Sequence, residues 1–286
     1  MTAQIISAVP VPFRRDGGID LPEFDATLRS LAEHVHGVLV AGTTGEFPAL
    51  DDAERVELFG RAIDVLGAER VIAHIGHASA RQVVRLAESA APLGITRFAA
   101  LTPYYLPTDD DGVVAHFQEI TAALPGARVY AYLFPERTGL AVSPEALGRI
   151  MALPGMAGVK LSGGAAARLA EYAPCLRDGQ ELYSGDDATL PLVLEKGGAG
   201  VVSGVSAAFP QTFAALARAL DAGPGPESDA LQATAVRLVG LVGPTIPRLK
   251  AALAARTGAV WASRMSQPAV ADDVRRAIEE AVARHR

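Results

Sequence analysis

The segment GVKLSGG, residues 158–164, places a lysine inside a run that is otherwise typical of a buried strand. Lys160 is one of only three lysines among 26 lysine and arginine residues, so arginine supplies most of the positive charge. A buried ammonium is expensive to desolvate, and lysine gives up its proton more readily than arginine. The neutral amine can then attack a carbonyl carbon and form an imine. The position therefore predicts a nucleophilic lysine, and the structural alternative is a packed stem whose ammonium reaches water.

Hydroxyl, phenol and guanidinium groups follow several other apolar runs, at the points where those runs end. They are Thr43 and Thr44 in GTTGE, Tyr104 and Tyr105 in TPYY, Tyr132 in YAYLF, and Arg137 in the loop after it. Phenols can carry protons to and from an imine, and a GTTG turn offers hydroxyls and backbone N–H groups to a carboxylate. An arginine can bind a second carboxylate through two hydrogen bonds. The set favours carbonyl chemistry on a substrate that carries a carboxylate.

Each of these groups also has a purely structural interpretation. The threonines could form an ordinary turn, the tyrosines could pack their rings, and Arg137 could be a solvated loop cation. Glu46 could be a general base, although a carboxylate directly after a glycine turn more often orients backbone N–H groups. The spacing of His74 and His77 suggests a metal ligand pair, but no cysteine or acidic cluster accompanies it, so we predict no metal site. Cys175 is interpreted as a packing residue.

The elements that must hold these groups follow from the hydrophobic pattern. Short runs rich in Val, Ile and Ala predict eight strands, and intervening stretches with helical spacing predict eight helices. The expected strands cover residues 5–13, 37–42, 70–76, 97–102, 128–134, 156–162, 181–186 and 200–206, and the expected helices begin near Leu21, Asp51, Ser79, Asp109, Ser143, Ala165, Asp187 and Pro210.

Eight alternating strands and helices over about 220 residues predict an α/β protein with a (β/α)₈ barrel. A doubly wound open sheet is the alternative, weakened because no G-x-G-x-x-G follows the first strand. The segment GPGPES then introduces about 60 residues of helical pattern without another strand. We therefore expect a barrel domain over residues 1–222 and a helical extension over residues 223–286. In a barrel of this kind, functional groups lie where strands end.

Composition limits the classes of partner. Half of the 286 residues are hydrophobic and the formal net charge is −6, without a basic cluster that would favour nucleic acid. No apolar run reaches about 18 residues and no signal peptide is recognisable at the N-terminus. A single cysteine excludes an intramolecular disulfide. We expect a cytoplasmic protein that binds small molecules, with neither nucleic acid nor membrane as a partner.

Five motifs in this order resemble the dihydrodipicolinate synthase / N-acetylneuraminate lyase family of pyruvate-dependent class I aldolases. They are GTTGEFPAL, TPYYLPT, YLFPERTG, GVKLSGG and YSGDD, and PTIPRLKAAL resembles the family's C-terminal helical segment. The resemblance implies that Lys160 forms the Schiff base and that Tyr132, Thr43 and Tyr105 relay protons, with Tyr105 reaching in from a neighbouring subunit. It also implies that Thr44, Arg137, Gly185 and Val202 bind substrate, that no metal or organic cofactor is used, and that the chain forms a homotetramer built as a dimer of dimers.

The sequence also departs from the family pattern. Leu133, Phe134 and Leu161 replace residues that commonly include an asparagine and an acid, and no counterparts of the lysine-feedback site stand near Asp51–Glu54 or Ala78. Arg137 and SGDD favour condensation of pyruvate with aspartate semialdehyde. The GEFP turn resembles 4-hydroxy-2-oxoglutarate and 2-keto-3-deoxy sugar acid enzymes, so an aldolase or dehydratase of that kind is the alternative. A non-catalytic barrel that binds 2-oxo acids is the alternative from another class.

Overall fold

A computed structural model describes residues 2–243 and 245–285. Eight parallel strands form a closed barrel in sequence order, which confirms the predicted (β/α)₈ architecture. The strands are β1 (Gln4–Ala8), β2 (Gly37–Val40), β3 (Val71–His74), β4 (Arg97–Leu101), β5 (Arg128–Leu133), β6 (Met156–Leu161), β7 (Glu181–Ser184) and β8 (Gly200–Ser203).

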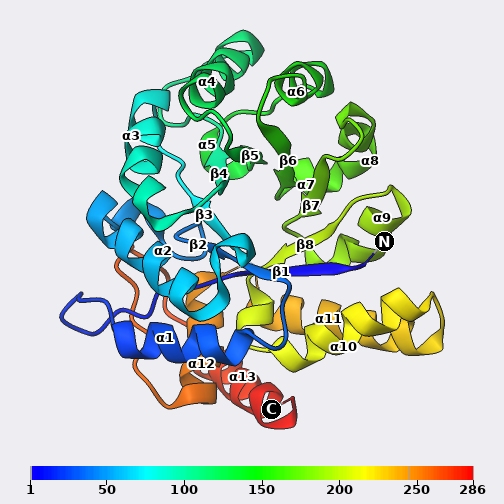
Figure 1. Ribbon diagram of the computed structural model, residues 1–286. Coiled ribbons are helices and arrows are strands. Elements are labelled where there is room, and N and C mark those ends of the chain that lie inside the picture. The colour runs from blue at the N-terminus through cyan, green and yellow to red at the C-terminus, as the bar shows by residue number, and fades with distance from the viewer. Residues whose placement is uncertain (1, 244, 286) are drawn as a thin grey trace. The chain divides into compact units, whose positions relative to one another are not determined.

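Helices separate the strands and continue after the last one (Figure 1). They are α1 (Leu21–Leu31), α2 (Asp52–Leu66), α3 (Ala80–Ala90), α4 (Asp110–Ala123), α5 (Pro135–Thr138), α6 (Pro144–Met151), α7 (Gly164–Ala167), α8 (Leu169–Tyr172), α9 (Leu190–Glu195), α10 (Pro210–Ala222), α11 (Pro226–Val242), α12 (Ile246–Thr257) and α13 (Asp272–Arg284). The helix after β6 is split into two single turns, and a short helix not expected from the pattern follows β5.

Local cap chemistry explains where several helices begin. Asp51 and Glu54 form a reciprocal capping box at the start of α2, and the Ser143 side chain accepts from the Ala146 N–H at the start of α6. The strands are buried on both faces, as expected of parallel strands covered by helices. Sequence signals for helix starts are therefore accurate here to one or two residues, except near α9.

The chain packs as two compact units, one formed by Val71–Val202 and the other by Thr2–Arg70 together with Ser203 onward. The first unit contains β3 to β7, paired from Ala73–Phe98 to Leu161–Ser184, with one shift in register between Val129 and Tyr130. The second contains the β1–β2 pair and the helices after β8, in which α10 lies beside α11 and α12 beside α13 (Figure 1). The predicted domain boundary at Ala222 stays a prediction.

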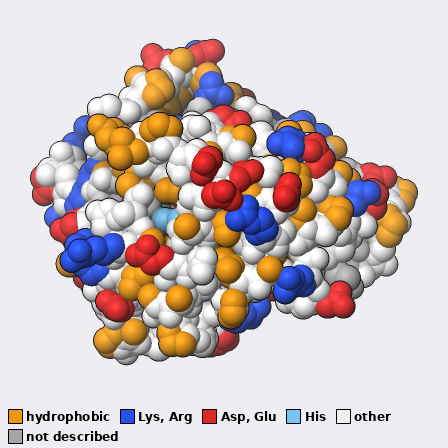
Figure 2. Space-filling model, turned by 90° about the horizontal axis from the view of Figure 1, so that it is seen from above, with side chains coloured by type: hydrophobic (Ala, Val, Ile, Leu, Met, Phe, Trp, Pro, Cys, Tyr) orange, Lys and Arg blue, Asp and Glu red, His pale blue; other side chains and the backbone are white. Residues whose placement is uncertain are grey.

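The surface carries both signs of charge. Figure 2 shows acidic and basic side chains interspersed over the face that it presents. Among the described helices, none by itself has the length and apolar character needed to cross a membrane; α11 and α12 meet that criterion only as a pair.

Candidate active site

Lys160 and Tyr132 are lateral neighbours on adjacent strands. The β5–β6 register pairs Tyr132 with Lys160, and the β6–β7 register pairs Lys160 with Tyr183. Lys160 is 7% exposed, and its Nζ lies 4.0 Å from the centroid of the Tyr132 ring. Within the described residues the amine forms no ion pair. The structure thus places a buried lysine against an aromatic face, without an ion-pair partner among the described residues.

The Tyr132 ring is held by two other rings. His74 meets it edge-on with the ring centroids 6.0 Å apart, and Phe134 lies tilted against it at 6.1 Å. His74 is fully buried at the end of β3, so its ring serves as packing for Tyr132. Across the described chain, His, Cys, Asp and Glu side chains nowhere gather in a group of three or more that could hold a metal ion.

The loops after β5 and β6 are tied together. Glu136 Oε1 accepts a hydrogen bond of 2.7 Å from the Gly164 N–H, at the first residue of α7. Arg137, next along α5, is exposed, and its guanidinium carbon lies 5.5 Å from the centroid of the Phe134 ring. Arg137 pairs with no carboxylate among the described residues. The guanidinium is therefore held over an aromatic ring with its N–H groups available to a ligand.

Gly185 and Val202 lie at the ends of β7 and β8. The Gly185 N–H donates to the Leu161 carbonyl at 2.6 Å, and a Cβ at this position would lie 2.1 Å from Ser162 Oγ, so a larger residue would displace the Ser162 side chain. Val202 is 4% exposed within β8. Gly185 is thereby fixed next to the strand end that carries Lys160, while Val202 contributes to the core.

Tyr105 is separated from these groups within one chain. Its side chain is 90% exposed, that of Leu106 is 74% exposed, and the Tyr105 backbone has a φ of 82°. Tyr105 makes no hydrogen bond or ring contact with the part of the chain that the structure describes. Bulky residues rarely adopt a positive φ, so the surrounding loop holds this ring outward at some conformational cost.

Thr43 and Thr44 belong to the other compact unit and lie in a closed turn after β2. The Glu46 N–H donates to the Thr43 carbonyl at 3.0 Å, and the Phe47 N–H donates to the Gly42 carbonyl at 3.2 Å. Both threonines are partly exposed. The side chain of Thr44 faces Gly204, since a Cβ on that glycine would lie 3.5 Å from Thr44 Oγ1. The turn thus carries two partly exposed threonine side chains, whose hydroxyls are groups that can bind a carboxylate.

Two clusters were not foreseen from the sequence. Glu46 is fully buried and forms an ion pair with Lys250 of α12. Lys250 lies in the motif PTIPRLKAAL, which does not indicate that Glu46 is its partner. Glu181, the first residue of β7, gathers Arg97, Arg128 and Tyr130 around its carboxylate. Residue type alone gave no signal, because both clusters depend on contacts between distant segments.

Cys175 has a packing role, as its sequence context suggests. Its Sγ donates to the Pro144 carbonyl at 3.2 Å, and burial raises the pKa of the thiol. A raised pKa lowers the fraction of reactive thiolate. Cys175 therefore lacks the character of a nucleophile.

Comparison with known proteins identifies relatives along the whole chain. The sequence model described as "Dihydrodipicolinate synthetase family" matches residues 1–282. A 4-hydroxy-tetrahydrodipicolinate synthase of Synechococcus sp. (strain CC9605) is 32% identical over 286 residues, which cover 98% of this chain and 94% of the relative. An uncharacterized DapA-like lyase of Halobacterium salinarum is 33% identical over 279 residues, 96% of this chain and 91% of the relative.

Solved structures agree with this relationship. The crystal structure of dihydrodipicolinate synthase from Thermotoga maritima superposes with a TM-score of 0.91 at 25% sequence identity, over 100% of this chain and 99% of that one. The similarity therefore covers the barrel and the C-terminal helices alike.

Proposed function

We propose that this chain, which belongs to the dihydrodipicolinate synthetase family of lyases, forms a Schiff base between Lys160 and pyruvate or a related 2-oxo acid. The observation that carries the proposal is the placement of Lys160, buried at the end of β6 with its amine over the Tyr132 ring. A lysine held in this way, without a carboxylate partner, is suited to attack a carbonyl carbon.

The proposed cycle begins when the Lys160 amine adds to the ketone carbon of the 2-oxo acid. Water then leaves, and an imine forms. Loss of a proton from the neighbouring methyl group gives an enamine, whose carbon bonds to the carbonyl carbon of an aldehyde, and hydrolysis or ring closure then frees the amine. In this proposal Tyr132, with Thr43 and Tyr105, carries the protons that move at each step.

Substrate-binding roles are proposed for four residues. Thr44 and the N–H groups of its turn would bind the pyruvate carboxylate, with Gly185 and Val202 lining the pocket. Arg137 would bind the carboxylate of the aldehyde, for which its exposed guanidinium is suited. These roles make aspartate semialdehyde the preferred aldehyde.

The three residues that depart from the family pattern differ in whether they can affect substrate binding. Alternation along a strand turns neighbouring side chains to opposite faces, so Leu133 and Leu161 point away from Tyr132 and Lys160. Both leucines are almost fully buried, which fits packing under the helices. Phe134 differs, because it contacts the Tyr132 ring and lies beneath Arg137. Among these three positions, Phe134 is the one that can alter substrate choice.

Cleavage or dehydration of a 2-keto-3-deoxy sugar acid or of 4-hydroxy-2-oxoglutarate is the second candidate, favoured by the GEFP turn at residues 45–48. Both candidates use the same imine and differ in the partner of the enamine. A barrel that binds 2-oxo acids without turnover is the remaining alternative.

Assembly is part of the proposal. Tyr105 and Leu106 form an exposed apolar pair on a strained loop, a feature typical of interfaces between protein chains. We place Tyr105 in the site of a second copy, within a dimer of dimers in the cytoplasm. Its phenol would complete the proton relay there.

The substrate is tested by measuring pyruvate consumption with aspartate semialdehyde and pyruvate release from 2-keto-3-deoxy sugar acids and 4-hydroxy-2-oxoglutarate. The proposal predicts the highest kcat/KM for condensation with aspartate semialdehyde. Efficient release with no condensation would establish the second candidate, and binding without turnover on any substrate would establish a binding barrel.

A further inference from the structure

Glu46 lies directly after the Thr43–Thr44 turn and is completely inaccessible to solvent. Its Oε1 accepts a hydrogen bond from the Lys250 ammonium. Its Oε2 accepts from the backbone N–H groups of Arg264 and Met265 at 3.1 and 2.8 Å. The carboxylate is thus occupied on both oxygens. It has no free position from which to serve a substrate as a base.

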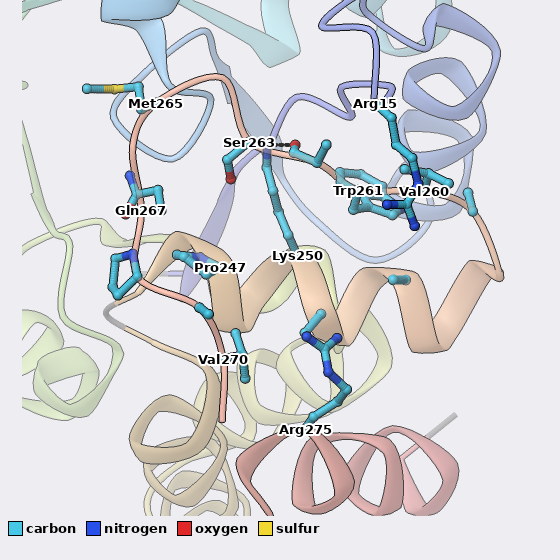
Figure 3. A pocket seen from close by; sticks show the side chains of 16 residues that line it. Arg15, Pro247, Lys250, Val260, Trp261, Ser263, Met265, Gln267, Val270 and Arg275 are labelled. Carbon is cyan, nitrogen blue, oxygen red and sulfur yellow. Dashed lines mark hydrogen bonds between the residues drawn. The ribbon is translucent and has the colours of Figure 1, made fainter. Parts of the chain in front are cut away.

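Lys250 reaches this carboxylate from α12. The side chain is 2% exposed, and its Nζ also donates to the Ala262 carbonyl at 2.7 Å and lies 4.5 Å from the centroid of the Phe13 ring. Figure 3 shows Lys250 extending from α12 to the segment that carries Ser263, along one wall of a pocket. Burial lowers the pKa of the Lys250 amine, and the Glu46 carboxylate acts in the opposite direction.

The Arg264 side chain forms a second set of hydrogen bonds between residues 262–265 and the N-terminal part of the chain. Its guanidinium binds both carboxylate oxygens of Glu54 at 2.7 and 2.6 Å and donates to the carbonyls of Ala49 and Gly17. Glu54 belongs to the capping box that starts α2. The chain from Glu46 to Glu54 is therefore joined to residues 262–265 at both of its ends.

The backbone of Glu46 links this network to the threonines. Glu46 has a φ of 56°, a left-handed conformation that non-glycine residues adopt at a cost of roughly 1 kcal/mol or more. In that conformation its N–H closes the turn on the Thr43 carbonyl. Leu249, which precedes Lys250 in α12, lies on the same side of Gly204 as Thr44, because a Cβ built on that glycine would lie 3.5 Å from both side chains. The direction in which the turn presents its hydroxyls thus depends on contacts with α12.

A buried ion pair is weak evidence for stability, because desolvation offsets much of the attraction, whereas such pairs can specify one geometry. We propose that Glu46, Lys250 and Arg264 are positioning residues, through which the C-terminal helical segment sets the Thr43–Thr44 turn for the carboxylate of the 2-oxo acid. This inference rests on the proposed function for the identity of the ligand.

The test compares E46Q, K250M and the double variant E46Q/K250M with the native chain. K196M is the matched control, since Lys196 forms an exposed ion pair with its neighbour Glu195. One readout is hydrogen–deuterium exchange of a peptide spanning residues 42–50 without ligand. The other is the pyruvate concentration that half-saturates adduct formation under borohydride, together with the trapping rate at saturation.

The single variants are expected to exchange faster over residues 42–50 and to need about 10- to 100-fold more pyruvate, because hydrogen bonds to its carboxylate would be weakened. The trapping rate at saturating pyruvate should stay within about twofold of native, and K196M should match the native chain in both readouts. A folded variant with native exchange and native pyruvate requirement would overturn the proposal, and so would a loss of trapping rate alone.

The double variant covers the case in which a lone buried charge prevents folding. With both charges gone it is expected to fold and still to need more pyruvate. If it cannot fold, the pair is a stability element and the positioning role is wrong. Absence of any adduct on the native chain would instead refute the proposed function, while exchange over residues 42–50 would still decide whether the network positions the turn.

Discussion

The Nζ atom of Lys160 lies 4.0 Å from the centroid of the Tyr132 ring, and the two residues are paired in the β5–β6 register. An aromatic face can hold an ammonium in place without the strong hydrogen bonds that a carboxylate would form. The same ring is fixed by His74 and Phe134. The arrangement therefore orients the amine in advance of any substrate.

Replacement of Arg137 by alanine should impair reaction with carboxylated aldehydes. A charge-assisted hydrogen-bond pair of this kind contributes about 1.5–3 kcal/mol, so KM for aspartate semialdehyde should rise by roughly 10- to 100-fold. Adduct formation with pyruvate should be unchanged. Arg149→Ala is the control, because Arg149 forms an exposed ion pair with Asp111. An equal loss with uncharged aldehydes would remove the assigned role of Arg137.

Tyr105 should act on a neighbouring copy of the chain. Tyr105→Phe and Lys160→Ala should each abolish most of the turnover, because one removes the proton carrier and the other the nucleophile. Mixed after dissociation and reassembly, the two variants should regain activity, since a pair of unlike chains contains one intact site. Steady-state turnover of the mixture measures this directly. Lack of recovery, with mixed oligomers verified by native mass spectrometry, would place Tyr105 outside the partner's site.

His116 should make the fold sensitive to acid. Burial lowers its pKa to about 4, against an ordinary value near 6.5, so the unfolded chain binds a proton at higher pH than the folded chain does. Stability is then retained above about pH 6.5 and lost as the pH falls toward 4, by on the order of 3 kcal/mol at most. Urea unfolding from pH 7 to 4.5 measures the slope. In His116→Asn this component should vanish, and an unchanged slope would show that other groups cause the loss.

Glu181 should support the fold without serving the chemistry. It is the first residue of β7, where its carboxylate accepts from Arg128 at 2.8 Å and from the Tyr130 hydroxyl, whose pKa burial raises to about 12. The N-terminal ends of barrel strands face away from the catalytic rim. Glu181→Gln should lower the free energy of unfolding by about 2 kcal/mol. Adduct formation should persist, and its loss in a folded variant would contradict this assignment.

The hydrophobic pattern predicted all eight strands because parallel strands in a barrel are continuous apolar runs with distinct ends. Helix starts were predicted well where a cap residue marks them, as at Asp51 and Ser143. The start of the helix after β6 was predicted to within one residue, but its division into two single turns at Arg168 was not. The sequence therefore predicts the start of a helix accurately where a cap residue fixes it.

The site was only partly accessible from the sequence. Lys160 could be singled out because a lysine in an apolar run is unusual, and Tyr132 because it stands at the matching strand end. The Glu46–Lys250 pair joins residues that are 204 positions apart, and neither residue type predicts the position of the other. Phe134 could be noticed as a departure, but its contacts with Tyr132 and Arg137 depend on how the loop after β5 folds.

The central claim is the imine at Lys160, and reductive trapping tests it most directly. The native chain is incubated with pyruvate and borohydride, its intact mass is measured, and the modified residue is located by peptide mapping. We predict a gain of one carboxyethyl group per chain on the peptide that contains Lys160, and no gain in Lys160→Ala. A native chain that gains no mass, or that carries the adduct at Lys196 or Lys250, would contradict the account.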